Sequence, residues 1–362
     1  MKKIVLNLIA CAVAFPSFAT ETLTSPDGNI KLTFDLTKAG VPEYTVQYHG
    51  KPVILPSTLG FEIKDEAPLT SGFKQGKPVF TSVDETWAPV WGENDSIVNK
   101  YNQMTVPLTQ KADGMTRKMN IVFRAYDDGI GFRYEFPAQK WKGFTIADEA
   151  SQMAMTGDHT AWWIPGDYDT QEYKYTRSRL SEIRATSEGA RMHNLSQTGF
   201  SPTGVQTSLM LKTDDGLYIN LHEAALIDSP AMHLNLDDTN MVFTSWLTPD
   251  INGDKAVVTT PFKTPWRTVM VSDKATDILA SDLILNLNDP CVLDDTSWIH
   301  PTKYMGVWWE MITNKSSWAY CDAENFDLAT FDYSKATPNN RHGANNDNVR
   351  RYIDFAAEAG MD

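Results

Sequence analysis

Three short segments place carboxylates beside aromatic or small residues, a composition that suits chemistry on a polar ligand. In the first, Tyr218 to Leu226, an alternating stretch ends in His222-Glu223 and continues with small residues. A carboxylate at a strand end can project into a cleft and coordinate a hard cation such as calcium through oxygen. The residues alone favour a plainer role, a surface glutamate or half of an ion pair for Glu223 and a hydrogen-bonded structural histidine for His222.

The other two segments are rich in tryptophan. Trp87 and Trp91 lie on either side of Pro89, a spacing that one strand face cannot accommodate, so the pattern predicts a shaped loop. Such a loop can form a platform on which a sugar ring stacks, although packing suits at least one of the two rings. In the third segment, Trp309 and Glu310 end an apolar run and would lie at the carboxyl end of a barrel strand, where active sites form.

These segments lie within a long region of alternating apolar and polar residues that extends from residue 30 to about 290. Typical examples are Ile30 to Leu36, Tyr44 to Tyr48, Met119 to Ala125 and Ile130 to Phe136, with turn sequences such as Asp127-Asp128-Gly129 between them. No convincing amphipathic helix interrupts the pattern. The sequence therefore predicts a large antiparallel β-sandwich.

A different pattern begins after Asn288-Asp289-Pro290. Tyr304 to Trp309 reads as a strand buried on both faces, followed by a long polar loop and by a helix in which Val349, Tyr352, Ile353 and Ala356 recur at helical spacing. Asn345 to Asp347 are the capping candidates and Gly360 is the stop. Because such a crossover helix leads back to a parallel strand, we expect the gene product to continue past Asp362. A terminal helix packed on the sandwich is the alternative.

The two ends and the charge bound the class of protein. Residues Met1 to Ala19 read as a secretory signal peptide, which predicts a periplasmic or secreted protein; Cys11 suggests a lipoprotein signal as the minor alternative. Only Cys291 and Cys321 remain in the mature chain, and their pairing is open.

With 46 acidic against 32 basic residues and a net charge of -14, the chain is unsuited to nucleic acid or anionic lipid. No Gly-rich phosphate loop, Gly-x-Ser-x-Gly elbow or His-Glu-x-x-His motif is present.

Taken together in this order, the motifs resemble glycoside hydrolase family 97. They are the Trp87-to-Asn102 loop, His222-Glu223-Ala224-Ala225-Leu226, Thr264-Pro265-Trp266-Arg267-Thr268, Gly306-Val307-Trp308-Trp309-Glu310, and His342-Gly343-Ala344 leading into Val349 to Phe355. The resemblance implies a mainly β chain: a signal peptide at 1–19, a β-super-sandwich at 20–290, and at 291–362 the first βα unit of a (β/α)8 barrel.

The resemblance also implies an exported glycosidase for α-glucosides, or else α-galactosides, that takes oligosaccharides and holds Ca2+ in its active site. Glu223 best fits the calcium ligand of the N-terminal domain, and Trp309, Glu310, Trp91 and Arg267 are the candidate substrate-binding residues. The family's catalytic carboxylates come from later barrel strands, so none is expected in this chain, and we expect residues 1–362 alone to be inactive. A non-catalytic carbohydrate-binding or adhesive β-sandwich is the alternative.

Overall fold

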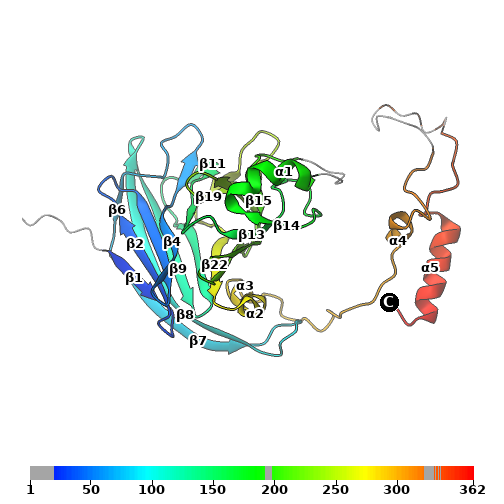
Figure 1. Cartoon of the computed structure of the whole chain (residues 1–362), viewed down its shortest axis with the longest axis horizontal. Coiled ribbons are helices and arrows are strands. Elements are labelled where there is room, and N and C mark those ends of the chain that lie inside the picture. The colour runs from blue at the N-terminus through cyan, green and yellow to red at the C-terminus, as the bar shows by residue number, and fades with distance from the viewer. Residues whose placement is uncertain (1–19, 192–197, 322–329, 331, 333, 335) are drawn as a thin grey trace, which may run out of the picture. The chain divides into compact units, whose positions relative to one another are not determined.

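The structure, a computed structural model, describes residues 20–191, 198–321, 330, 332, 334 and 336–362 (Figure 1). The chain divides into two compact units, Met1–Pro290 and Cys291–Asp362. The signal peptide expected at residues 1–19 lies outside the described residues. Across the described ranges, every helix is too short or too polar to span a bilayer.

The first unit is built from antiparallel sheets, of which one has eight strands. Their order is β1-β2-β3-β4-β12-β19-β18-β15. The bounds of these strands are β1 Glu21–Thr24, β2 Ile30–Leu36, β3 Pro42–Tyr48, β4 Lys51–Thr58, β12 Gln152–Met155, β15 Gly204–Gln206, β18 Met232–Asp237 and β19 Val242–Leu247.

The second sheet has eleven strands, in the order β14-β13-β16-β17-β22-β10-β9-β8-β6, with β21 paired to β10 and β7 paired to β8. Their bounds are β6 Phe73–Gln75, β7 Val79–Trp87, β8 Ile97–Ala112, β9 Met115–Tyr126, β10 Gly129–Phe136, β13 Thr160–Trp163, β14 Thr176–Arg179, β16 Leu209–Lys212, β17 Tyr218–Ala224, β21 Phe262–Lys263 and β22 Trp266–Ser272. A third sheet, β20-β11-β5, is formed by β20 Ala256–Thr259, β11 Gly143–Glu149 and β5 Phe61–Ile63.

The two large sheets pack face to face around one apolar core, which confirms the predicted β-sandwich. The alternate residues of β2, β9 and β10 that the sequence assigned to the inner face are all buried. Rings from opposite sheets meet there: the Phe34 and Phe123 centroids lie 5.9 Å apart and those of Tyr44 and Phe132 lie 5.2 Å apart. This contact between inner faces is the defining feature of a sandwich.

Helices do interrupt the β region, contrary to the sequence prediction. They are the 3-10 turn η1 Leu180–Glu182, α1 Ile183–Arg191, α2 Ala275–Leu279 and α3 Leu283–Asn286. In α1 the buried residues are Ile183 and the polar Ser187, so the buried face lacks the large apolar residues that would have marked a helix in the sequence. The turn is started instead by a polar contact, in which the Arg179 backbone N–H donates to the Glu182 carboxylate at 2.8 Å.

The second unit contains α4 Trp308–Ile312 and α5 Asn346–Glu358. The helix expected near Val349 is confirmed: the Asn345 side chain caps α5 by accepting the Asn348 N–H at 2.9 Å, and Gly360 follows its end with φ 65°. The predicted strand at Tyr304 to Trp309 is wrong. A strand buried on both faces needs neighbours, and the described part of this unit has none, so the backbone bonds locally as α4.

Candidate functional site

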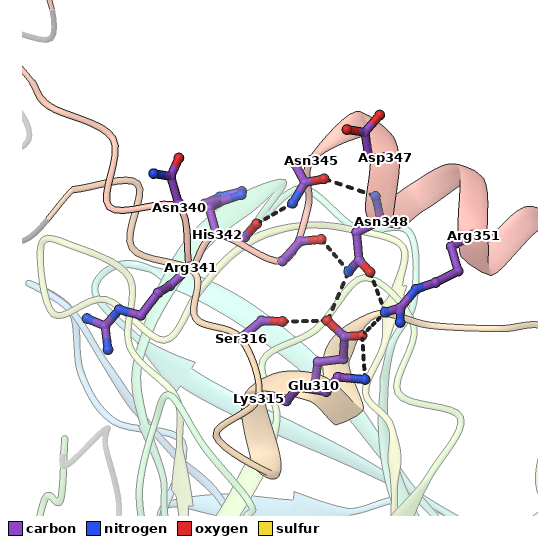
Figure 2. Close-up of a pocket in the computed structure, with 11 residues that line it drawn as sticks. Glu310, Lys315, Ser316, Asn340, Arg341, His342, Asn345, Asp347, Asn348 and Arg351 are labelled. Carbon is purple, nitrogen blue, oxygen red and sulfur yellow. Dashed lines mark hydrogen bonds and ion pairs between the residues drawn. The ribbon is translucent and has the colours of Figure 1, made fainter.

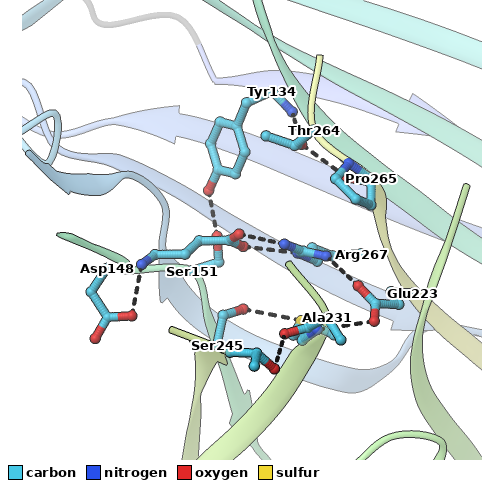
Figure 3. Close-up of polar contacts among 12 residues, drawn as sticks. Tyr134, Asp148, Ser151, Glu223, Ala231, Ser245, Thr264, Pro265 and Arg267 are labelled. Atoms are coloured by element: carbon cyan, nitrogen blue, oxygen red, sulfur yellow. Dashed lines mark hydrogen bonds and ion pairs between the residues drawn. The ribbon is translucent and has the colours of Figure 1, made fainter. Parts of the chain in front are cut away.

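A buried polar cluster in the first unit joins Glu223 to Arg267 (Figure 3). Arg267 is joined in turn to Glu149. Glu223 on β17 lies directly opposite Arg267 on β22 in the antiparallel register. Arg267 Nη1 donates to Glu223 Oε2 at 2.8 Å, while Nε and Nη2 donate to the two oxygens of Glu149 at 3.0 and 2.6 Å. The guanidinium therefore holds Glu149 by a two-point contact and Glu223 by a single one.

Burial governs the electrostatics of this cluster. Arg267 and Glu149 are each 1% exposed, and Glu223 is 7% exposed. Burial raises the pKa of Glu223, and the charge of Arg267 opposes that rise without cancelling it. Burial acts to lower the pKa of Arg267, but the charge and hydrogen bonds of Glu149, followed by the charge of Glu223, raise it overall. One cation thus faces two carboxyl groups, and burial opposes the ionised form of Glu223.

Glu223 differs from Glu149 because it borders a hollow. That hollow has a volume of about 290 Å³ and is lined by the end of β17, the start of β18, the segment between them, and His222. His222 is half-buried, and burial lowers its pKa, so the ring is neutral near pH 7. The hydrogen bond expected for His222 is not found at Nδ1 among the described residues. Of the cluster's two carboxylates, only Glu223 is placed to meet a ligand.

The residues around Glu223 do not by themselves fit a calcium ion. Calcium takes six to eight oxygen ligands, and no group of three or more His, Cys, Asp or Glu residues converges anywhere in the described part of the chain. Glu223 Oε1 accepts the Met232 N–H at 2.9 Å and Oε2 accepts from Arg267. A carboxylate has about four lone-pair sites, so with two of them occupied Glu223 retains about two for a ligand. The other ligands would have to come from elsewhere.

Arg267 is not placed as the substrate-binding residue that the sequence suggested. Its side chain is 2% exposed and three of its nitrogens already donate to carboxylates. The plainer reading of Glu223, half of an ion pair, is what the structure shows.

Sequence reasoning missed Glu149 because a β-bulge reverses the alternation of β11. Phe144 and Ile146 point into the core, so period two would bury Asp148 and expose Glu149. The register of β11 against β5 shifts between Ile146 and Asp148, and Glu149 becomes the buried residue instead. No local sequence signal marks that shift.

The tryptophan loop forms a second hollow, of about 460 Å³, between residues 89–97 and residues 279–285. Trp91 lines it and is 51% exposed. Trp87 ends β7 and donates its ring N–H to Asn286 Oδ1 at 2.9 Å, which makes it a packing residue. The predicted division of roles between the two rings therefore agrees with the arrangement of this loop.

In the second unit, Glu310 lies inside α4 and binds α5, not at the end of a strand (Figure 2). Its carboxylate accepts from Asn348 Nδ2 at 2.9 Å and from Arg351 Nη2 at 2.5 Å, and also from the Ser316 hydroxyl. Hydrogen bonds from Ser316 and then Asn348 lower its pKa to about 2. The neighbouring Trp309 is 69% exposed. The two cysteines of this unit, Cys291 and Cys321, are not joined in a disulfide.

Comparison with known proteins assigns the chain to a class. The family model described as "Glycosyl-hydrolase 97 N-terminal" matches residues 23–290, the first unit almost in full. The sandwich is therefore the N-terminal domain found in a class of carbohydrate-cleaving enzymes. Since the match covers most of its length, the chain belongs to glycoside hydrolase family 97.

Individual relatives agree with that assignment. A family 97 enzyme from Pseudoalteromonas sp. strain K8, solved in complex with acarbose, is 35% identical with a TM-score of 0.77, over 94% of this chain and 46% of that one. The same protein has been solved in complex with panose, again with a TM-score of 0.77. A retaining α-galactosidase of Bacteroides thetaiotaomicron is 26% identical over 100% of this chain and 52% of its own length. The chain spans about half the length of these relatives.

Proposed function

We propose that the protein is a glycoside hydrolase acting on α-glucosides, with this chain supplying the sandwich domain and one wall of the active site. The observation that carries the proposal is Glu223, a strand-end carboxylate held at the edge of a hollow in a family 97 domain. Acarbose and panose are bound by the 35% identical structure, which favours α-glucosides. The α-galactosidase at 26% identity keeps α-galactosides as the alternative.

The residues of this chain set a limit on what it does alone. Glycoside hydrolysis uses two carboxylates flanking the scissile bond, about 5–5.5 Å apart for retention and about 6.5–9.5 Å for inversion. Glu149 and Glu223 share one guanidinium, and Glu149 is buried, so these two cannot flank a sugar. This pair is therefore not the catalytic one. As the family resemblance implies, we expect the catalytic acid and its base or nucleophile to lie outside this chain, and the chain alone to be inactive.

Calcium dependence is part of the proposal, with Glu223 as one ligand. A bound calcium ion would supply positive charge next to the substrate oxygens. The contribution of this chain is to present one carboxylate oxygen whose orientation is fixed by Met232 and Arg267. Among the described residues no second or third Asp, Glu, His or Cys joins Glu223 in a metal-binding group, so further carboxylate ligands would have to come from outside them.

The test compares this purified chain with the product of the complete gene on p-nitrophenyl α-glucoside and α-galactoside. We expect turnover of the glucoside by the complete product only, loss of that turnover with a calcium chelator, and recovery when calcium is returned. Hydrolysis by residues 1–362 alone would refute the assignment of catalysis to other residues. Activity indifferent to the chelator would remove the role proposed for Glu223.

Export is proposed on the strength of Met1 to Ala19 alone. Expression in a bacterial host should yield a periplasmic protein whose first residue, by N-terminal sequencing, is near Thr20. An uncleaved protein in the cytoplasm would contradict this proposal.

A carbohydrate-binding module without catalysis is the second candidate, favoured by the hollow beside Trp91. An exposed indole near Glu93, Asn94 and Asp282 offers a stacking face together with hydrogen-bonding groups. Calorimetric titration of this chain with maltose and melibiose tests the idea. Binding that Trp91→Ala abolishes would support a module, whereas no heat with either sugar would exclude it.

A further inference from the structure

The segment that follows Glu223 has an unusual backbone. Residues 225–231 connect β17 to β18, and within them Ala225 and Asp228 both have φ of 53°. Positive φ is unfavourable for alanine and is retained only where surrounding contacts impose it. Leu226 and Ile227 on this segment are 46% and 65% exposed, and Leu226 lines the hollow that Glu223 borders. A strained segment with exposed apolar side chains at a pocket rim is typical of a ligand-contacting loop.

The contacts that impose this conformation start from the buried charge cluster. Met232, the first residue after the segment, donates its N–H to Glu223 Oε1 at 2.9 Å, so Glu223 closes the loop across its base. Arg267 fixes the other carboxylate oxygen of Glu223 at 2.8 Å. Arg267 is fixed in turn by the two-point contact with Glu149.

These four residues also come from all three sheets of the first unit. Glu223 and Arg267 lie in the eleven-stranded sheet, Met232 in the eight-stranded sheet, and Glu149 in the three-stranded sheet. A displacement of Arg267 would therefore move the Glu223 carboxylate of the eleven-stranded sheet relative to residues 225–231, which lead into β18 of the eight-stranded sheet.

We propose that Arg267, held by Glu149, is a positioning residue that orients the Glu223 carboxylate and, through Met232, the 225–231 loop toward the ligand. The inference rests on the proposed function, because a ligand at Glu223 is what the orientation serves. Arg267 itself contacts no ligand, since it is buried and each of its three side-chain nitrogens already donates to a carboxylate. Glu149 supplies the fixed reference point, because it is buried away from the hollow.

The competing view is that Arg267 merely stabilises the sandwich, and Arg117 provides the matched control. Arg117 is also 1% exposed and also pairs with two carboxylates, Glu66 and Asp113, but none of these residues lines the hollow. Arg267→Lys keeps the positive charge but removes the planar guanidinium that donates to Glu149 and Glu223 at the same time. Arg117→Lys makes the same chemical change elsewhere in the same unit.

The first measurement is hydrogen–deuterium exchange on this 362-residue chain, which requires no enzymatic activity. We expect Arg267→Lys to accelerate exchange at residues 225–232 by about tenfold or more, because a charge-assisted contact that orders them is weakened. Glu149→Gln should also accelerate exchange at residues 225–232. The new amide N–H2 group is a donor and cannot accept the hydrogen bond that Arg267 gives to the Glu149 carboxylate. Arg117→Lys should leave 225–232 unchanged. Uniform acceleration by Arg267→Lys, or the same pattern in both lysine variants, would overturn the proposal.

The second measurement uses the product of the complete gene. Arg267→Lys should lower kcat/KM on the aryl glycoside by about tenfold or more, since a small misplacement of a ligand-binding group is costly, while Arg117→Lys leaves it within about twofold. Faster exchange at 225–232 with unchanged kcat/KM would overturn the positioning role. If the wild-type product cleaves neither glycoside, the proposed function fails, and the exchange data alone decide whether Arg267 holds the loop.

Discussion

Replacing Arg267 by methionine should destabilise the sandwich strongly, and the cost can be worked from the contacts. Arg267 makes three charge-assisted hydrogen bonds, at 3.0, 2.6 and 2.8 Å, to two carboxylates whose side chains are 0% and 7% exposed. Methionine fills a similar volume but leaves both carboxylates buried without a cation. Breaking a buried ion pair in this way costs about 3–5 kcal/mol.

Arg117→Met is the informative comparison. Arg117 is equally buried, but its partners Glu66 and Asp113 have side chains that are 29% and 45% exposed, so water can solvate them after the substitution. We expect Arg117→Met to lower the free energy of unfolding by about 1.5–3 kcal/mol, the range for loss of hydrogen bonds to a charged group. The difference between the two variants reflects the burial of the carboxylates, since both substitutions remove a buried guanidinium.

The pH dependence separates the two variants further. Burial already raises the pKa of Glu223 above the ordinary 4.5, and removing Arg267 raises it more. The folded variant then binds a proton more tightly than the unfolded chain does, so its stability falls as pH rises from about 4.5 toward neutrality. The loss of unfolding free energy in Arg267→Met relative to wild type should therefore be larger at pH 8 than at pH 5.

Urea unfolding followed by tryptophan fluorescence at the two pH values measures both quantities. Arg117→Met serves as the control in the same buffers and should show a deficit that changes little between pH 5 and pH 8. Equal costs for the two methionine variants, or a deficit of Arg267→Met that shrinks as pH rises, would refute the account of a buried charge cluster.

Three further predictions concern single positions. Ala225→Gly should be neutral or stabilise the chain by up to about 1 kcal/mol in urea unfolding because glycine accepts φ of 53°, whereas Ala224→Gly in β17 should destabilise it by about 0.5–1 kcal/mol; the reverse order would show that Ala225 is not strained. Trp91→Ala should change stability by less than about 0.5 kcal/mol, because the ring is half exposed; a larger loss in the same assay would make Trp91 a core residue. The depressed pKa of Glu310 means that its contact with Arg351 is present above pH 4.5 and is lost as pH falls toward 2, so the protection of the α5 amides relative to their intrinsic exchange rates should fall over that window, and Glu310→Gln should abolish the change.

The sandwich was predictable because its strands alternate cleanly, as in β2, β9 and β10, and burial of the alternate side chains follows from that period alone. Two local features were not predictable. The bulge in β11 that turns Glu149 inward depends on pairing with β5, which is distant in sequence. The strand expected at Tyr304 to Trp309 required neighbouring strands; the described unit has none, and only Trp308 and Trp309 adopt regular structure, as the start of α4. In both cases non-local pairing decided the outcome.

The Thr264-to-Thr268 motif shows why sequence reasoning made Arg267 a substrate-binding candidate although the structure buries it. Every residue of β22 is buried, because the strand packs on both faces. On one face the Trp266 ring centroid lies 4.4 Å from the guanidinium carbon of Arg133. Just before the strand, Thr264 Oγ1 accepts the Tyr134 N–H at 3.1 Å. On the other face Arg267 reaches Glu223. Thr264 and Trp266 therefore contact residues of β10, while Arg267 joins β22 to β17, so substitution of Arg267 should alter the site through Glu223 without removing any contact to a ligand.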